Sequence, residues 1–165
     1  MLGVDCGSAI TGIGVVETHG RSCRLLHFGA IRPPRSQEFP DRLAHIHREL
    51  ERLVQEFRPD AIALEQIFQA HNVKTAMQLS QVRGAVLLAA SRAGVRVVEY
   101  SALTVKKSVV GYGRAEKHQV QWMVQRELGL ASPPQPDDAA DALAVAICHW
   151  RAETAQRRLR ASASR

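Results

Sequence analysis

Apolar residues in the first hundred positions occur mainly in short runs, and their spacing predicts five β-strands. Three of these runs lie before residue 32 and are separated by glycine-containing turns, which favours an antiparallel block. The run over residues 60–65 is almost entirely apolar, as in strands that are buried in a parallel sheet. The expected strands are Leu2–Val4, Thr11–Val16, Arg21–Ile31, Asp60–Glu65 and Val95–Tyr100.

Other apolar residues recur every three or four positions, which is the period of an amphipathic α-helix. The pattern is clearest over Asp41–Phe57, which Pro59 follows closely. A second helix is expected over Lys74–Arg92, with Gly94 as its C-terminal stop. Further helical segments are expected at Thr104–Val110, Ala115–Leu128 and Pro136–Trp150.

The order of these elements predicts an α/β fold with a mixed five-stranded sheet flanked by helices. Three strands come first, and helices and strands then alternate, which places helices on both faces of one sheet. The 165 residues are enough for a single domain with a hydrophobic core. We expect a domain over residues 1–150 and a basic, flexible C-terminal tail over residues 151–165.

The net charge of +6 indicates an anionic partner, although part of it lies in the tail. The tail has five arginines and one glutamate and supplies four of the six charges, so it either contacts nucleic acid or is a solvated end. A second basic stretch, residues 101–118, contains one acidic residue, Glu116. Its basic residues are Lys106, Lys107, Arg114 and Lys117.

The cysteines and the hydropathy pattern favour a cytoplasmic protein without a membrane partner. No apolar stretch is long enough to cross a bilayer, and the N-terminal residues lack the features of a signal peptide. Cys6, Cys23 and Cys148 are odd in number and show no CxxC spacing. They fit reduced thiols and neither a disulfide framework nor a zinc site.

Four acidic residues lie at notable positions. For two of them burial of the carboxylate would be energetically unfavourable, and the other two would lie close together. Asp5 ends the first expected strand and Glu65 the fourth, and each follows an apolar run that would be buried. Asp138 and Asp141 are three residues apart and would share a helix face. This pair fits two explanations: Asp138 as N-cap with Asp141 at the third helical position, or a pair of ligands for a hard cation.

Together the four acids favour the metal-binding explanation. They would converge if the first and fourth strands are neighbours and the last helix packs across their ends, because ligands of open α/β sheets gather at the carboxyl ends of strands. An all-carboxylate cluster suits two Mg²⁺ ions and phosphoryl chemistry. Zinc is disfavoured because histidines and cysteines at suitable spacing are lacking.

Four segments are specific enough to suggest a family: VDCGSAITGIGVV, ALEQIFQAHNVKTAMQLSQVRGAV, EYSALTVKKSVVGYGRAEKHQVQWMV and PDDAADALAVAICHW. Together they resemble the RuvC family of Holliday-junction resolvases over residues 2–150. The resemblance implies a ribonuclease-H-like fold, a homodimer, and Mg²⁺-dependent cutting of paired strands of a four-way DNA junction in recombination and repair. It also implies a branch-migration helicase complex of the RuvA and RuvB type as partner.

The metal-binding acids of that family match Asp5, Glu65, Asp138 and Asp141. The resemblance implies that Asp5 bridges two Mg²⁺ ions, with Mn²⁺ as a substitute, and that Asp138 and Asp141 hold the ion that activates water. Glu65 would help to hold the ion on the leaving-group side. Asp137 matches no catalytic position and is assigned to capping, although which of the two adjacent aspartates is the nearer ligand stays open.

The DNA-binding residues implied by the resemblance are basic and aromatic. Lys106 and Lys117 match basic positions near the scissile phosphate. Lys107 and Arg114 match no such position and are included only because they are basic residues of the same stretch. Phe68 would stack on or wedge between bases, the alternative being packing beneath its loop. His149 is interpreted as structural, because a histidine near a helix C-terminus commonly caps it. The helix over residues 74–92 is the expected dimer interface.

Three other functions remain open at this point. The first is an ATP-binding module of the actin and sugar-kinase type, because Asp5-x-Gly7-x-x-x-Thr11-Gly12-x-Gly14 resembles its phosphate loop. The chain is long enough for only one of the two lobes of such proteins. The second is another nuclease of the same fold that acts on RNA or single strands. The third is a junction-binding protein that does not cut, which the presence of all four acids disfavours.

Overall fold

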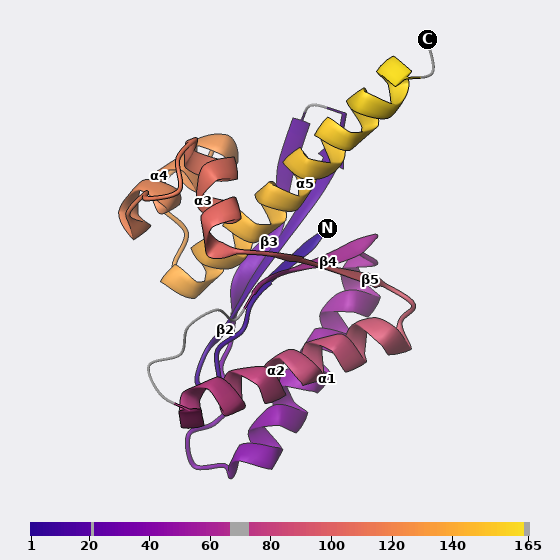
Figure 1. Ribbon diagram of the computed structural model, residues 1–165. Coiled ribbons are helices and arrows are strands. Elements are labelled where there is room, and N and C mark those ends of the chain that lie inside the picture. Colours follow the sequence, from indigo (N-terminus) through magenta and orange to yellow (C-terminus); the bar gives the residue numbers. More distant parts are fainter. Residues whose placement is uncertain (21, 67–72, 164–165) are drawn as a thin grey trace.

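The computed structural model describes residues 1–20, 22–66 and 73–163 and contains one mixed five-stranded sheet (Figure 1). The strand order is β3-β2-β1-β4-β5; β1 pairs with β2 and β2 with β3 antiparallel, whereas β4 pairs parallel with both β1 and β5. The strands are β1 (Leu2–Asp5), β2 (Thr11–His19), β3 (Ser22–Ile31), β4 (Ala61–Glu65) and β5 (Arg96–Tyr100).

Helices cover both faces of the sheet, and each face has its own apolar core. Helices α1 and α2 pack together on one face, and α5 lies on the other with α3 and α4 beside it (Figure 1). The helices are α1 (Phe39–Phe57), α2 (Val73–Arg92), α3 (Ala102–Val110), α4 (Lys117–Glu127) and α5 (Asp137–Ala163). The expected fold class, element order and neighbouring first and fourth strands are therefore confirmed.

Helix α5 departs from expectation at both of its ends. It begins at Asp137, and Pro136 contributes the carbonyl that accepts from the backbone N–H of Ala139 and Ala140. Asp137 and Asp138 therefore both lie in the first turn, so the assignment of Asp137 to capping is wrong and the alternative of Asp138 as N-cap is excluded. The helix also continues well past His149, so the prediction that this residue caps a helix C-terminus is wrong as well.

The described part of the expected tail is helical, since residues 151–163 continue α5 without a break. The division of the chain at residue 150 and the flexibility of the tail stay predictions. Within the described ranges, no helix combines the length and the hydropathy that crossing a bilayer requires.

Candidate active site

Asp5 and Glu65 end two neighbouring parallel strands, and their side chains lie on the same face of the sheet. Val4 of β1 and Leu64 of β4 are Cα partners, so the next residues, Asp5 and Glu65, lie side by side at the carboxyl edge. Val4 and Leu64 point into the core beneath α1 and α2. Because successive side chains of a strand alternate between faces, the two acids point towards α5.

Two glycines let the backbone of α5 approach the sheet closely enough to bring its acids to the same place. Gly12 of β2 is the Cα partner of Asp5, and a Cβ atom on Gly12 would lie 1.9 Å from the carbonyl oxygen of Asp138. A Cβ atom on Gly3 would lie 2.0 Å from the carbonyl oxygen of Ala142. Any larger residue at either position would push the first turns of α5 away from β1.

The pKa of Asp5 is raised by its burial and by the acidic side chains around it. Burial, followed by the charges of Asp141, Glu65 and Asp138, raises the pKa of Asp5 from 3.8 to about 7, and only Lys117 acts in the opposite direction. Of the two adjacent aspartates, it is Asp138 whose charge acts on Asp5. Four carboxylates therefore repel one another at a half-buried position, which is the charge pattern that a divalent cation would neutralise.

Two further carboxyl groups of the cluster also bind protons more tightly than usual. Burial and then the charge of Asp141 raise the pKa of Glu65, with Lys106 opposing. Burial also raises the pKa of Asp141, and the hydrogen bond and charge of Lys117 only partly offset it. The acids and the two lysines thus belong to one interacting group.

Lys117 is the cation that contacts the acids. Its Nζ lies 3.0 Å from Oδ2 of Asp141 and 3.6 Å from Oδ2 of Asp137. Burial lowers the pKa of Lys117, but the hydrogen bond and charge of Asp141 outweigh it, and the net shift is upwards. The ammonium group therefore partly neutralises the cluster from the N-terminus of α4.

The donor set fits a hard divalent cation, although the side chains do not stand in a closed ligand arrangement. Over residues 1–20, 22–66 and 73–163, no three His, Cys, Asp or Glu side chains converge tightly enough to hold a metal ion as they lie. The oxygens of Asp5, Glu65, Asp138 and Asp141 are nonetheless the ligands that Mg²⁺ and Mn²⁺ prefer.

Of the other residues predicted to bind DNA, one is linked electrostatically to this cluster. Lys106 of α3 is near enough to lower the pKa of Glu65. Lys107 and Arg114 are exposed, at the end of α3 and in the connection to α4. Phe68 lies outside the described residues.

The sequence did not indicate that Tyr100, His149 and Gly3 would help to build the site. Tyr100 is the Cα partner of Glu65, and its hydroxyl lies 2.8 Å from Nδ1 of the buried His149 on α5. Burial is the main cause that lowers the pKa of His149 to about 4, which keeps it neutral and structural. The packing role of Gly3 had a usable signal, since a glycine inside a strand often marks a close backbone approach.

The family model and the relatives reported below carry the same description. The family model described as crossover junction endodeoxyribonuclease RuvC matches residues 1–149. A protein of that description from Ruminiclostridium cellulolyticum is 52% identical over 149 residues, which cover 90% of each chain. One from Chloroflexus aurantiacus is 47% identical over 157 residues, 94% of this chain and 96% of the relative.

A solved structure also matches the fold closely. The structure described as Thermus thermophilus RuvC in complex with Holliday junction substrate has a TM-score of 0.86 and 37% sequence identity. The match covers 90% of this chain and 90% of that chain.

Proposed function

The chain belongs to the RuvC family of crossover junction endodeoxyribonucleases, and from this premise we propose how its acids cut DNA. It is a structure-specific nuclease that resolves four-way Holliday junctions in recombination and repair. The single observation that carries this function is the family match over residues 1–149, in a chain whose acids Asp5, Glu65 and Asp138 interact at one edge of the sheet. The actin-type module and the non-cutting junction binder are therefore set aside.

The nuclease is metal-dependent, and we assign the metal ligands to Asp5, Glu65, Asp138 and Asp141. These residues would hold two Mg²⁺ ions, with Mn²⁺ as a substitute. When bound, such ions lower the pKa of a water molecule and neutralise the charge that develops on the phosphate. The raised pKa of Asp5 supports the assignment, because ionised carboxylates this crowded need a counter-charge.

The residues of the chain would position the phosphodiester and screen its charge. Lys117 and Lys106 flank the carboxylates, so each can turn an ammonium group towards a phosphate oxygen once the acids have other partners. Lys107 and Arg114 are exposed, on α3 and in its connection to α4, and would add sequence-independent contacts to the DNA backbone. Phe68 is proposed to stack on a base at the junction. No serine or cysteine nucleophile is needed, since charge stabilisation is the main requirement of this reaction.

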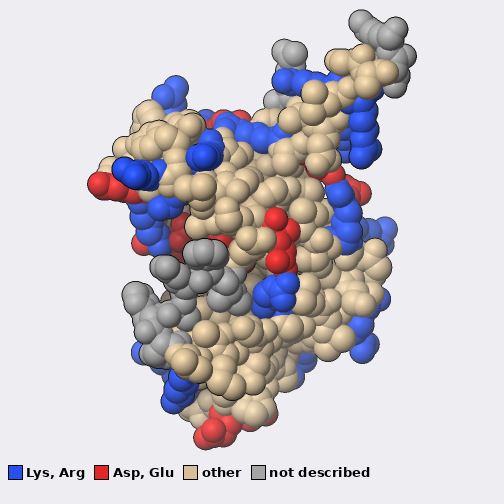
Figure 2. All heavy atoms as spheres, in the orientation of Figure 1, with Lys and Arg blue, Asp and Glu red and all other residues tan. Residues whose placement is uncertain are grey.

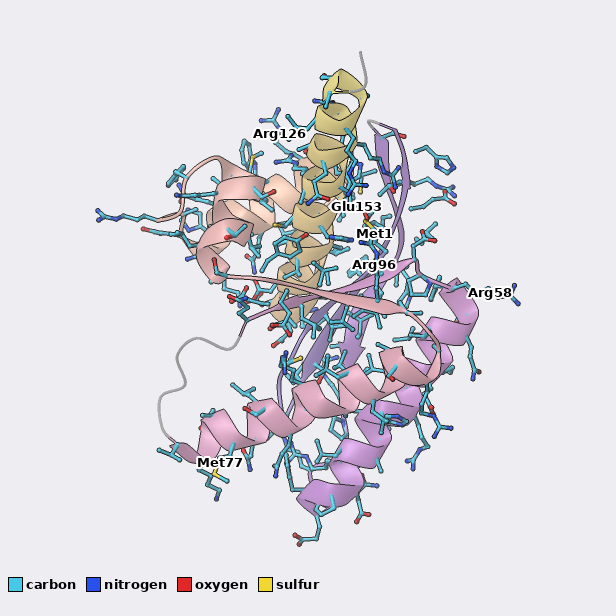
Figure 3. The ribbon with its side chains drawn as sticks, turned by 45° about the vertical axis from the view of Figure 1, so that its right-hand side comes forward. Met1, Arg58, Met77, Arg96, Arg126 and Glu153 are labelled. Carbon is cyan, nitrogen blue, oxygen red and sulfur yellow. The ribbon has the colours of Figure 1, made fainter. Side chains whose placement is uncertain are left out.

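A homodimer is proposed because a two-fold junction needs two equivalent cutting sites. Helix α2 offers the surface: Val73, Met77 and Leu88 are 76%, 60% and 53% exposed and share one helix face with Gly84. Figure 3 shows Met77 projecting from the first turns of α2 away from the rest of the molecule. Light scattering that gives a monomer mass, both alone and with a junction, would contradict this proposal.

A branch-migration complex of the RuvA and RuvB type is the proposed partner assembly, on the strength of the family alone. A stimulation of junction cutting by such a complex, absent on a static junction that cannot migrate, would support it. Equal cutting with and without the complex on migrating junctions would argue against it.

Cleavage assays with matched substrates test the proposed activity. Purified protein and Mg²⁺ are incubated with a labelled four-way junction, a linear duplex and a single strand of the same sequence, and with an RNA strand. We expect paired nicks in the junction and little product from the others. Preferential cutting of RNA or single strands would instead favour the second alternative, another nuclease of the same fold.

A further inference from the structure

The C-terminal part of α5 leaves the body of the protein as an exposed helix. Residues 155–163 are exposed, and the helix projects past the ends of the sheet strands (Figure 1). The start of this segment is anchored: Glu153 pairs with Arg96 of β5, whose side chain lies close to it in Figure 3. Arg157, one turn further along the helix, also pairs with Glu153, and 3.3 Å separates its Nη2 from Oε2 of Glu153.

The projecting helix is strongly basic. Residues 151–163 contain four arginines and one glutamate. Three of these charges are engaged within the protein, since Arg151 pairs with Glu127 at 2.8 Å and Glu153 is shared by Arg96 and Arg157. Arg158 lines two adjacent surface pockets along the helix and has no ion pair among the described residues. Figure 2 shows basic side chains on both sides of the base of this projection.

The same uninterrupted helix carries the catalytic acids at its other end. Asp141 and the segment 157–160 are separated by 16 to 19 residues of α5, or about 24–29 Å at 1.5 Å per residue. Duplex DNA rises about 3.4 Å per base pair, so this distance spans roughly seven to eight base pairs. A duplex arm that leaves the active site alongside α5 would meet the arginines at that distance from the cut.

We propose that the projecting helix, residues 155–163 with Arg157, Arg158 and Arg160, binds the phosphate backbone of one duplex arm of the junction. The inference rests on the proposed function, because it needs the junction to be the substrate. Charge complementarity supports DNA as the occupant, since guanidinium groups suit phosphate. A membrane or protein groove would require a broad apolar face, and the segment 151–163 has one large apolar residue, Leu159.

The test combines charge removal with arm length. The triple variant Arg157→Gln, Arg158→Gln, Arg160→Gln is made in the full chain, in an Asp5→Asn background to block cleavage during binding. A matched control carries Arg48→Gln, Arg52→Gln and Arg58→Gln, which remove three charges from α1 and its C-terminal end on the other face of the sheet. Junction affinity is measured across a salt series for arms of about five and about twenty base pairs, closed by hairpin loops.

With long arms, the triple variant should bind more weakly. The slope of log K against log salt should become shallower by about 0.9 for each phosphate that the arginines no longer neutralise, or by about 2 to 3 in total. With short arms the variant should bind like its parent. Equal affinity and equal slope for long arms would overturn the proposal, as would an equal weakening in the α1 control. The variants without Asp5→Asn are also tested for cleavage of saturated short-arm junctions, where failure of the parent enzyme would instead refute the proposed function.

Discussion

Asp5 and Gly12 face each other as Cα partners on β1 and β2, and the missing side chain of Gly12 is what admits the backbone of α5 at this point. The carbonyl oxygen of Asp138 fills the space that a Cβ atom would need. The distance between a strand-end acid and a helix acid is thus set by a glycine that carries no chemistry itself.

Gly12→Ala should abolish most junction cleavage and destabilise the fold by about 1–3 kcal/mol, the usual effect of overpacking. The added methyl group would collide with backbone and not with a flexible side chain, so the first turn of α5 must move away from Asp5. Cleavage rate and urea unfolding measure the two effects. Gly29→Ala is the control in the same sheet, because the nearest atom to its Cβ would be 3.8 Å away. Normal cleavage by a folded Gly12→Ala protein would contradict the prediction.

Asp5→Asn should stabilise the protein at high pH when metal is removed with a chelator. The folded state holds a proton on Asp5 up to about pH 7, whereas the unfolded state releases it near pH 3.8, so the wild-type protein loses stability as the pH rises between these values. Asparagine does not ionise. The variant should therefore gain up to about 4 kcal/mol over wild type at pH 8 and little at pH 4.

Denaturant unfolding at several pH values measures this difference. Asp60→Asn, at an exposed position before β4, serves as the control. A stability difference between Asp5→Asn and wild type that does not change from pH 4 to pH 8 would show that the fold does not raise the pKa of Asp5.

Asp138→Asn and Asp137→Asn should differ sharply, although the residues are adjacent. Asp138 contributes to the high pKa of Asp5, and its backbone packs on Gly12. The side chain of Asp137 is 51% exposed. Single-turnover cleavage should fall on the order of 100-fold or more for Asp138→Asn and stay within about threefold of wild type for Asp137→Asn. The reverse order would assign the ligand to Asp137.

Lys117→Ala should weaken binding to every junction regardless of sequence, and the salt slope should become shallower by about 0.9 if Lys117 neutralises one phosphate. Its ammonium group lies 3.0 Å from Asp141 and can turn to a phosphate when the acids hold a cation. Fluorescence anisotropy over a salt series measures both quantities, beside Arg48→Ala on α1 as the control. Affinity unchanged at every salt concentration would exclude binding of DNA by Lys117.

Much of the fold and the position of the acids could be predicted from the sequence because their signals are local. Apolar runs ending in Asp5 and Glu65 indicate strand ends, and family motifs identify the remaining acids. The details that depend on tertiary packing could not be predicted. The start of α5 at Asp137 and its continuation to Ala163 depend on contacts with the sheet and on pairs such as Arg96–Glu153, which join residues far apart in the chain.

The most direct test of the account is an anomalous difference map from crystals grown with Mn²⁺ near pH 8. We predict manganese peaks within coordination distance of carboxylate oxygens of Asp5, with Glu65, Asp138 and Asp141 as the other protein ligands and Lys117 turned away from Asp141. Manganese bound elsewhere, or a fully occupied map with no peak at Asp5, would contradict the claim that these four residues form the catalytic centre.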